Sequence, residues 1–220
     1  MPFATLNGAT IEHGILTLVR SGVWTADLVI ELPVPPVGAV QITLGADSSL
    51  LFAGTVQRGG ASRGASILRV IGGAGGLQKV LAAKGYRGVT VKLVLTELLT
   101  AAGEKLSALA DPSLLAVNLA SWARLQEPAC VALAALMHVA PGATWRIGSD
   151  GTVWVGTEPW PQTQLGDYLV TKDDPQYARQ EIAANVPNVY PGELLAGRQV
   201  STVEHRIDPT APRATIFYES

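Results

Sequence analysis

The chain has 220 residues, of which 48% are hydrophobic and only 15% charged, and its formal net charge is −2. This length allows one large all-β domain or two smaller ones, and the nearly balanced charge argues against a dedicated nucleic-acid-binding protein. Because the charged fraction lies well below the ~25% of an ordinary soluble domain, we expect partner proteins to cover much of the surface.

The remaining features of the sequence indicate in which compartment the chain is made. The single cysteine, Cys130, excludes an internal disulfide. The first residues lack the basic start and apolar run of a signal peptide, and the longest apolar runs fall short of the ~18 residues that a membrane span needs. We therefore expect a chain that is made in the cytosol and has no membrane partner.

Residues 10–71 predict antiparallel strands. In 24–32, WTADLVIEL, apolar residues alternate with Thr25, Asp27 and Glu31, which is the period of a strand with one buried face. Further strands are predicted in AVQITL, LLFAGTVQ and SILRVI, and the proline-rich PVPPVG must be a loop.

The period changes at Thr90. From there to Gly103 the apolar residues follow one helix face, with Thr90 as the N-cap and Gly103 as the C-terminal stop. A second helix is predicted from Pro128 to Ala140.

Strands resume after the second helix. TWRIGSDGTVWVG predicts a hairpin that turns at Ser149-Asp150-Gly151, and DYLV, ARQEI, GRQVSTVEHRI and RATIFY follow as strands. The sequence thus predicts a mainly β fold with a small helical insert and two β-barrel-like units. The expected parts are a first β-barrel unit at 1–85, the insert at 86–141 and a second β unit at 142–220.

Glu204, His205 and Asp208 are the most enzyme-like group of residues. Neighbours on a strand point to opposite faces, so Glu204 and His205 cannot form a local acid–base pair. Asp208 precedes a proline and is a natural turn residue. We interpret the group as a strand and its turn, not as a site.

No other motif predicts catalysis, a cofactor or a metal. His13 and His138 are isolated and lack the spacing of metal ligands. The glycine-rich stretch 70–80, VIGGAGGLQKV, departs from the dinucleotide-binding fingerprint at Gln78 and from the P-loop, which needs a Lys-Ser/Thr pair. We interpret it as a flexible bend between a strand and the insert.

Basic residues gather in one stretch that lacks acidic residues, between Asp47 and Glu97. This stretch could be a solvated face, could dock an acidic neighbouring subunit, or could face nucleic acid inside a tube. Seven cations lie in it: Arg58, Arg63, Arg69, Lys79, Lys84, Arg87 and Lys92. We predict partner contacts at Arg58, Arg63, Lys79, Lys84 and Arg87.

Several segments together resemble a known family. FAGTVQRGG, GGAGGL and YRGVTVKLVLTELLTAAGEKLS are similar to segments of the phage baseplate hub proteins of the late-control-D type, which are related to the trunk of type VI secretion spikes. ATWRIGSDGTVWVG and the ending YPGELLAGRQVSTVEHRI…RATIFY resemble the second β unit of that family. The resemblance covers most of residues 50–218.

This resemblance implies a structural protein of the virion, assembled in the host cytoplasm. A homotrimer would form a pseudo-sixfold ring that joins the hexameric tail tube to the trimeric central spike, without catalytic residues or a cofactor. The implied partners are other copies of the chain, the tube protein, the spike protein, other baseplate proteins and the tape measure protein, with at most transient passage of DNA through the lumen. Two alternatives stay open: a small hydrolase that uses His205 or His138, and a ligand-binding β-barrel.

Overall fold

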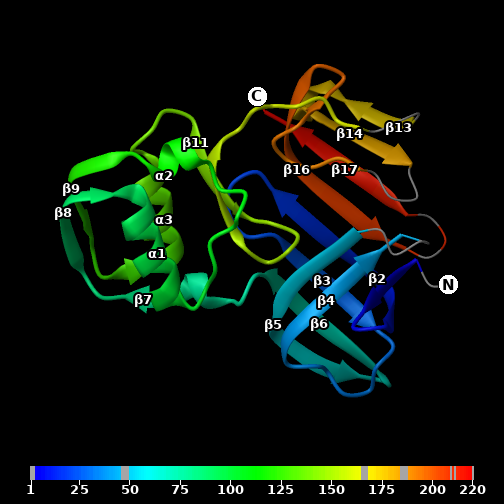
Figure 1. Cartoon of the computed structure of the whole chain (residues 1–220). Helices are drawn as coiled ribbons and strands as arrows, with labels where there is room; N and C mark the ends of the chain where they lie inside the picture. Colours follow the sequence, from blue (N-terminus) through cyan, green and yellow to red (C-terminus); the bar gives the residue numbers. More distant parts are fainter. Residues whose placement is uncertain are drawn as a thin grey trace.

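The computed structural model describes residues 3–45, 50–164, 168–183, 188–208, 210 and 212–219. Figure 1 shows three parts, namely a β-barrel, a sheet that continues from it, and a helical unit at one side. This architecture confirms the predicted mainly β fold with a small helical insert. In the described part of the chain, no helix is long and apolar enough to cross a membrane.

The first strands form a closed barrel. They are β1 (Ala4–Leu6), β2 (Ala9–Val19), β3 (Thr25–Ile30), β4 (Gly38–Leu44), β5 (Leu50–Ser62) and β6 (Ala65–Gly72). Their hydrogen-bonded order is β1-β4-β5-β6-β3-β2, and the barrel closes because β1 also pairs with β2. Alternate residues of each strand point inward, as the sequence predicts, and they fill the interior as in other small barrels.

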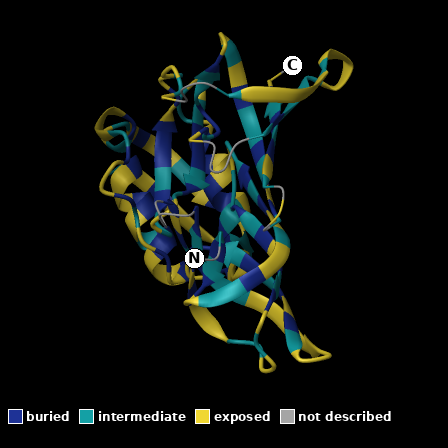
Figure 2. Cartoon of the chain, turned by 90° about the vertical axis from the view of Figure 1, so that its right-hand side faces the viewer, coloured by how far each residue is buried: buried dark blue, intermediate teal, exposed yellow. Residues whose placement is uncertain are grey.

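Strand β2 has two neighbours along one edge. Its first residues pair with β1, whereas Gly14 to Val19 pair with β16 (Arg198–Ile207). The sheet then continues through β17 (Arg213–Tyr218) and β14 (Arg179–Ala183) to β13 (Leu169–Asp174), with β15 (Leu194–Leu195) beside β16 and the 3-10 turn η2 (Pro175–Tyr177) between β13 and β14. The second β unit is therefore built directly onto the barrel. Figure 2 shows buried residues along the middle of the strands and exposed residues at the projecting hairpins.

The helical unit lies between β6 and β13 in the chain. Its helices are α1 (Val91–Ala102), α2 (Pro112–Leu115) and α3 (Ala129–Met137), with the 3-10 turn η1 (Gly76–Gln78) before them. Two ribbons frame the helices: β8 (Lys84–Thr90) with β9 (Asn118–Arg124), and β7 (Val80–Leu81) with β10 (Glu127–Pro128). Both predicted caps of α1 are confirmed, since the Thr90 side chain accepts a hydrogen bond from Leu93 and Gly103 adopts the left-handed conformation at φ 88°.

A hairpin connects the helical unit to the barrel. It consists of β11 (Ala143–Ile147) and β12 (Val153–Thr157), and it turns where the sequence predicts. At its turn the Ser149 carbonyl accepts a hydrogen bond from the Ala53 amide at 2.7 Å, and the Gly148 carbonyl accepts one from the Trp24 indole at 3.2 Å. Because Trp24 also packs edge to face on Phe52 inside the barrel, these contacts fix the hairpin to the end of the barrel.

Candidate functional site

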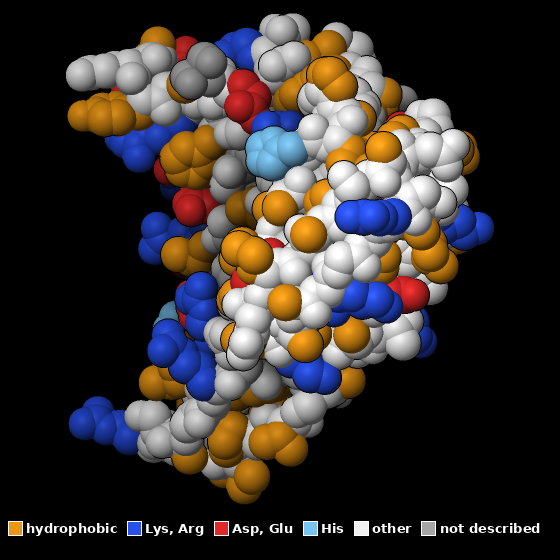
Figure 3. Space-filling model, turned by 90° about the vertical axis from the view of Figure 1, so that its left-hand side faces the viewer, with side chains coloured by type: hydrophobic (Ala, Val, Ile, Leu, Met, Phe, Trp, Pro, Cys, Tyr) orange, Lys and Arg blue, Asp and Glu red, His pale blue; other side chains and the backbone are white. Residues whose placement is uncertain are grey.

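One face of the continuous sheet is hollowed and open to solvent. Figure 3 shows it as the concave edge at the left, between protruding parts at the top and bottom. Its middle is a depression of about 890 Å³ lined by β16, β2, β3 and β6. Ile15 and Ile67 are 47% and 55% exposed there, although the other face of the same strands is buried. Exposed apolar side chains in a hollow are typical of a contact surface.

Opposite charges pair across this face from strand to strand. The pairs are Arg69–Asp27, Arg213–Glu181 and Arg179–Asp174. The hydrogen bond from Arg213 lowers the pKa of Glu181, so this pair stays charged at neutral pH. Arg206 on β16 lines the depression and has no ion pair among the described residues. The concave face is therefore a mixed surface of paired charges and apolar side chains.

The structure divides the predicted partner-contact residues between two distant places. Arg58 and Arg63 belong to the hairpin of β5 and β6, whereas Lys84 and Arg87 lie on β8 at the far side of the helical unit (Figure 1). Lys79 lies between them and donates a hydrogen bond to the Ala101 carbonyl at 2.8 Å. The basic stretch is thus continuous in the sequence and does not form one patch in space.

Nor does the stretch lack acidic neighbours. Asp27 pairs with Arg69 at 2.6 Å, and Glu97 of α1 pairs with Lys84. The hydrogen bond from Lys84 lowers the pKa of Glu97. In the described part of the chain, Arg58, Arg63 and Arg87 have no such partner, so they are the predicted residues whose charges remain open to another molecule.

The structure separates the side chains of Glu204 and His205, and Asp208 follows the end of β16. His205 points into the core and is 5% exposed, whereas Glu204 is half-buried on the other face of β16. The Asp208 carboxylate accepts hydrogen bonds from the backbone amide and the hydroxyl of Thr210, at 2.9 and 2.7 Å. This geometry confirms the interpretation as a strand followed by a turn.

Burial of His205 predicts a loss of stability in acid. Desolvation lowers its pKa to about 4, below the value of about 6.5 in an unfolded chain. The unfolded state therefore binds the proton first, so this contribution to stability is complete above pH 6.5 and is lost as the pH falls toward 4. We expect a loss of about 2 kcal/mol between pH 7.5 and pH 5 from this residue alone.

The measurement is urea unfolding of the native chain and the His205→Leu variant at both pH values. The variant should lose about 2 kcal/mol less than the native chain over this interval, whereas His13→Leu, which changes an exposed histidine, should behave as the native chain. Equal losses in the native chain and His205→Leu would contradict the prediction.

The other histidines lie apart from each other and from His205. His13 lines the concave face on β2, and His138 is exposed at the C-terminal end of α3. Among the described residues, no group of three or more histidine, cysteine, aspartate or glutamate side chains could hold a metal ion.

The glycine-rich loop is occupied by a side chain of the same protein. The Glu104 carboxylate accepts hydrogen bonds from the amides of Ala74 and Gly76, at 3.0 and 2.7 Å. Glu104 is 6% exposed and follows Gly103, the C-cap of α1. The interpretation of this stretch as a flexible bend is therefore wrong in one respect: a buried carboxylate fixes the loop to the end of α1. Sequence reasoning missed Glu104, and its only signal was an acidic residue directly after the glycine cap of a helix.

An ion pair with a buried carboxylate lies where the hairpin of β11 and β12 ends. Arg146 of β11 pairs with Glu158, whose side chain is 3% exposed. The Arg146 guanidinium also lies 4.0 Å from the ring centre of Trp154. Burial raises the pKa of Glu158, although Arg146 opposes the shift.

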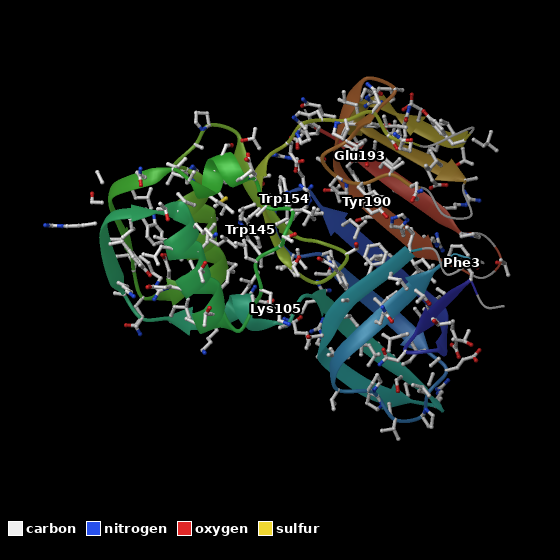
Figure 4. The ribbon with its side chains drawn as sticks, viewed as in Figure 1. Phe3, Lys105, Trp145, Trp154, Tyr190 and Glu193 are labelled. Atoms are coloured by element: carbon white, nitrogen blue, oxygen red, sulfur yellow. The ribbon has the colours of Figure 1, made fainter. Side chains whose placement is uncertain are left out.

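Figure 4 shows Tyr190 and Glu193 on the loop that precedes β15. They lie across from Trp145 and Trp154 of the hairpin. The Tyr190 amide donates to the Glu193 carboxylate at 3.1 Å. Beside them is a hollow of about 280 Å³, bounded by this loop, the hairpin turn and the barrel residues Trp24 and Phe52.

Comparison with known proteins relates the chain to others through its structure alone. No family model matches the sequence, and no curated protein matches it either. Among solved structures, the 43 kDa tail protein of prophage MuSo2 from Shewanella oneidensis superposes with a TM-score of 0.70 at 10% identity, over 98% of this chain and 97% of that chain. The chain has the fold of phage tail proteins.

Two further solved structures share this fold. A tail protein from Neisseria meningitidis MC58 superposes with a TM-score of 0.61 at 14% identity, over 98% of this chain and 94% of that chain. The E. coli c3393 protein, a component of the type VI secretion system with structural similarity to T4 bacteriophage tail proteins, has a TM-score of 0.60 at 10% identity, over 99% of this chain and 77% of that chain. The resemblance noted in the sequence is thus confirmed at the level of the fold.

Proposed function

We propose that the chain is a structural subunit of a phage tail baseplate, a hub that joins the hexameric tail tube to the trimeric central spike. The observation that carries the proposal is the arc of antiparallel strands from the distal half of β5 to β13. Its two outer edges have no strand partner among the described residues, and its concave face is open to solvent. An arc of this kind forms a ring when identical copies join head to tail and the rotation closes. The fold shared with phage tail proteins supports the same function.

A trimer fits the arrangement of two β units in each chain. Three copies would present six units, which suits a sixfold tube on one side and a threefold spike on the other. In this proposal the first unit spans 1–85, the helical insert 86–141 and the second unit 142–220. The helical insert stands away from the arc (Figure 1), where it can contact other baseplate proteins.

The ring would be part of the virion and would be assembled in the host cytoplasm. Its concave faces would line the lumen, where the tape measure protein resides and DNA passes transiently. Paired charges with few unpaired cations suit such a wall, since a strongly basic lining would retain the DNA.

The two alternatives gain no support from the side-chain geometry. A ligand-binding barrel needs an open interior, whereas Trp24 and Phe52 are 2% and 1% exposed in a packed core. A hydrolase needs a nucleophile beside its base, whereas His205 faces the core and His138 lies at the end of α3.

Mass in solution tests the proposal. We expect light scattering to give the mass of three chains for the chain alone, or the mass of three chains plus the spike protein after a spike protein from the same tail is added. A stable monomer of 23.0 kDa at all concentrations, with or without neighbouring tail proteins, would contradict it.

A further inference from the structure

A buried cation of the helical unit lacks a counter-ion among the described residues. Arg124 of β9 is 7% exposed, and its Nη1 is buried without a hydrogen-bond partner in that part of the chain. Its Nε donates to the Ala82 carbonyl at 2.8 Å, and no described carboxylate forms an ion pair with it. Such a group is costly, because it has left water without gaining a counter-charge.

A second cation lies directly opposite Arg124. Lys84 of β8 is its cross-strand partner in the register of the ribbon, and like charges at such positions repel each other. Glu97 of α1 compensates Lys84, since its Oε2 accepts hydrogen bonds from the Lys84 ammonium and, at 3.1 Å, from the Tyr86 hydroxyl. The charge of Arg124 is therefore left without a partner among the described side chains.

The exposed charged residues of the whole helical unit have one sign. In residues 76–140 all of them are cations, and the acidic residues of this range are buried or half-buried. Figure 3 looks onto the side of the molecule on which β8 and β9 lie, where Lys and Arg side chains are spread among apolar ones. The exposed cations are Lys79, Lys84, Arg87, Lys92 and Lys105. A surface of this charge attracts an acidic partner.

Exposed apolar side chains lie close to Arg124. Leu125 follows it in the chain and is 70% exposed, and Val80 of β7 is 57% exposed. Ala82 and Ala83, which link β7 to β8, are exposed and lie outside regular structure. A desolvated arginine beside apolar side chains is typical of the centre of a protein–protein interface.

From these observations we propose that the ribbon of β8 and β9 is a docking site for an acidic segment of another protein. A carboxylate of that segment pairs with the Arg124 guanidinium, whose planar fork suits it, and apolar side chains of the segment cover Leu125 and Val80. The site opens when Ala82 and Ala83 shift away from the guanidinium. The inference goes beyond the hub function and does not depend on the ring; in a baseplate the partner would be a neighbouring tail protein.

A nucleic acid fits this surface less well than a protein. Phosphates bind exposed cations along a strand, whereas Arg124 is buried and Leu125 and Val80 beside it are apolar. A protein segment can supply a carboxylate and apolar side chains together.

Fluorescence anisotropy with a labelled peptide of three Leu-Glu-Glu repeats tests the site in the full chain. We expect saturable binding to the native chain at low ionic strength. Arg124→Met removes the guanidinium and should weaken binding by about tenfold. Arg124→Lys keeps the charge but loses the fork, and should weaken it by about threefold. Glu97→Gln frees Lys84 for the peptide and should tighten binding by about threefold.

Two controls accompany these variants. Arg58→Met changes an exposed arginine of the barrel hairpin and should leave binding unchanged. A peptide with serine in place of leucine should bind the native chain about threefold more weakly, and Leu125→Ser should reduce this difference. We expect Arg124→Met to melt within about 3 °C of the native chain, because it loses one hydrogen bond and relieves an unpaired buried donor.

Three outcomes would overturn the proposal: a native chain that does not bind the leucine peptide, an Arg124→Met variant that binds it as tightly as the native chain, or an oligothymidylate of equal charge that binds more tightly than the peptide. The last outcome would assign the surface to nucleic acid. Were Arg124→Met to fold poorly, the opposite effects expected of Arg124→Lys and Glu97→Gln would decide. None of these outcomes bears on the hub function, which mass in solution tests.

Discussion

Gly76→Ala should destabilise the protein by about 3 kcal/mol or more and lower its melting temperature by about 6–12 °C. A Cβ atom at this position would lie 1.9 Å from the Ala102 carbonyl oxygen and 2.9 Å from its carbon. Both atoms belong to the backbone at the end of α1, so relief requires the helix and the glycine-rich loop to separate. That movement would also pull the loop amides away from the Glu104 carboxylate.

Gly85→Ala is the matched control. No atom lies within 4 Å of a Cβ at this position, and its backbone is not in the left-handed region. We expect a change within about 0.5 kcal/mol, because the added methyl group meets only solvent. Thermal and urea unfolding of both variants measure the difference. If Gly76→Ala and Gly85→Ala had the same melting temperature and free energy of unfolding, the close contact of loop and helix would be wrong.

Arg146→Met should cost about 3 kcal/mol at neutral pH. The substitution leaves the Glu158 carboxylate, 3% exposed, without its cation, and an uncompensated buried charge is far more costly than a lost surface pair. It also removes the contact of the guanidinium with the Trp154 ring. The matched control is Arg69→Met, which breaks an ion pair whose side chains are 31% and 59% exposed and should cost at most about 1 kcal/mol.

The pH dependence of the Arg146 variant identifies the cause. Burial already raises the pKa of Glu158 in the native chain, and removal of the cation raises it further. A carboxyl group whose folded pKa exceeds its unfolded pKa binds a proton more strongly in the folded state, so stability increases as the pH falls through the folded pKa toward the unfolded one. The variant should therefore lose less stability, relative to the native chain, at pH 5 than at pH 8. Adding Glu158→Gln should recover part of the loss at pH 8, and equal losses at both pH values would exclude the buried charge as the cause.

Patterns within a few residues predicted much of the fold. The alternation in 24–32 predicted β3, and the helix face with Thr90 and Gly103 predicted both ends of α1. The same alternation placed Glu204 and His205 on opposite faces and so excluded an acid–base pair. These predictions are reliable because side-chain direction along a strand or helix follows from local backbone geometry.

Contacts between distant segments could not be predicted in the same way. No residue near β2 in the sequence indicates that β16 pairs with β2 along the part of its edge that β1 does not cover. The glycine-rich loop was recognised, and its occupant, Glu104, was not. The sequence showed the stretch without acidic residues, but it could not show that its cations lie in separate places or that Asp27 and Glu97 approach two of them from other elements.

The sequence by itself determined the main strands of the β units, the helices α1 and α3 and both caps of α1, and it offered no local motif for catalysis, nucleotide binding or an internal disulfide. Only the tertiary structure decided that both β units share one hollowed sheet, which basic residues keep open charges, and which strand edges remain for a partner. The physical reason is range: periodicity and capping act over a few residues, whereas sheet order and ion pairing depend on which distant segments are buried against each other.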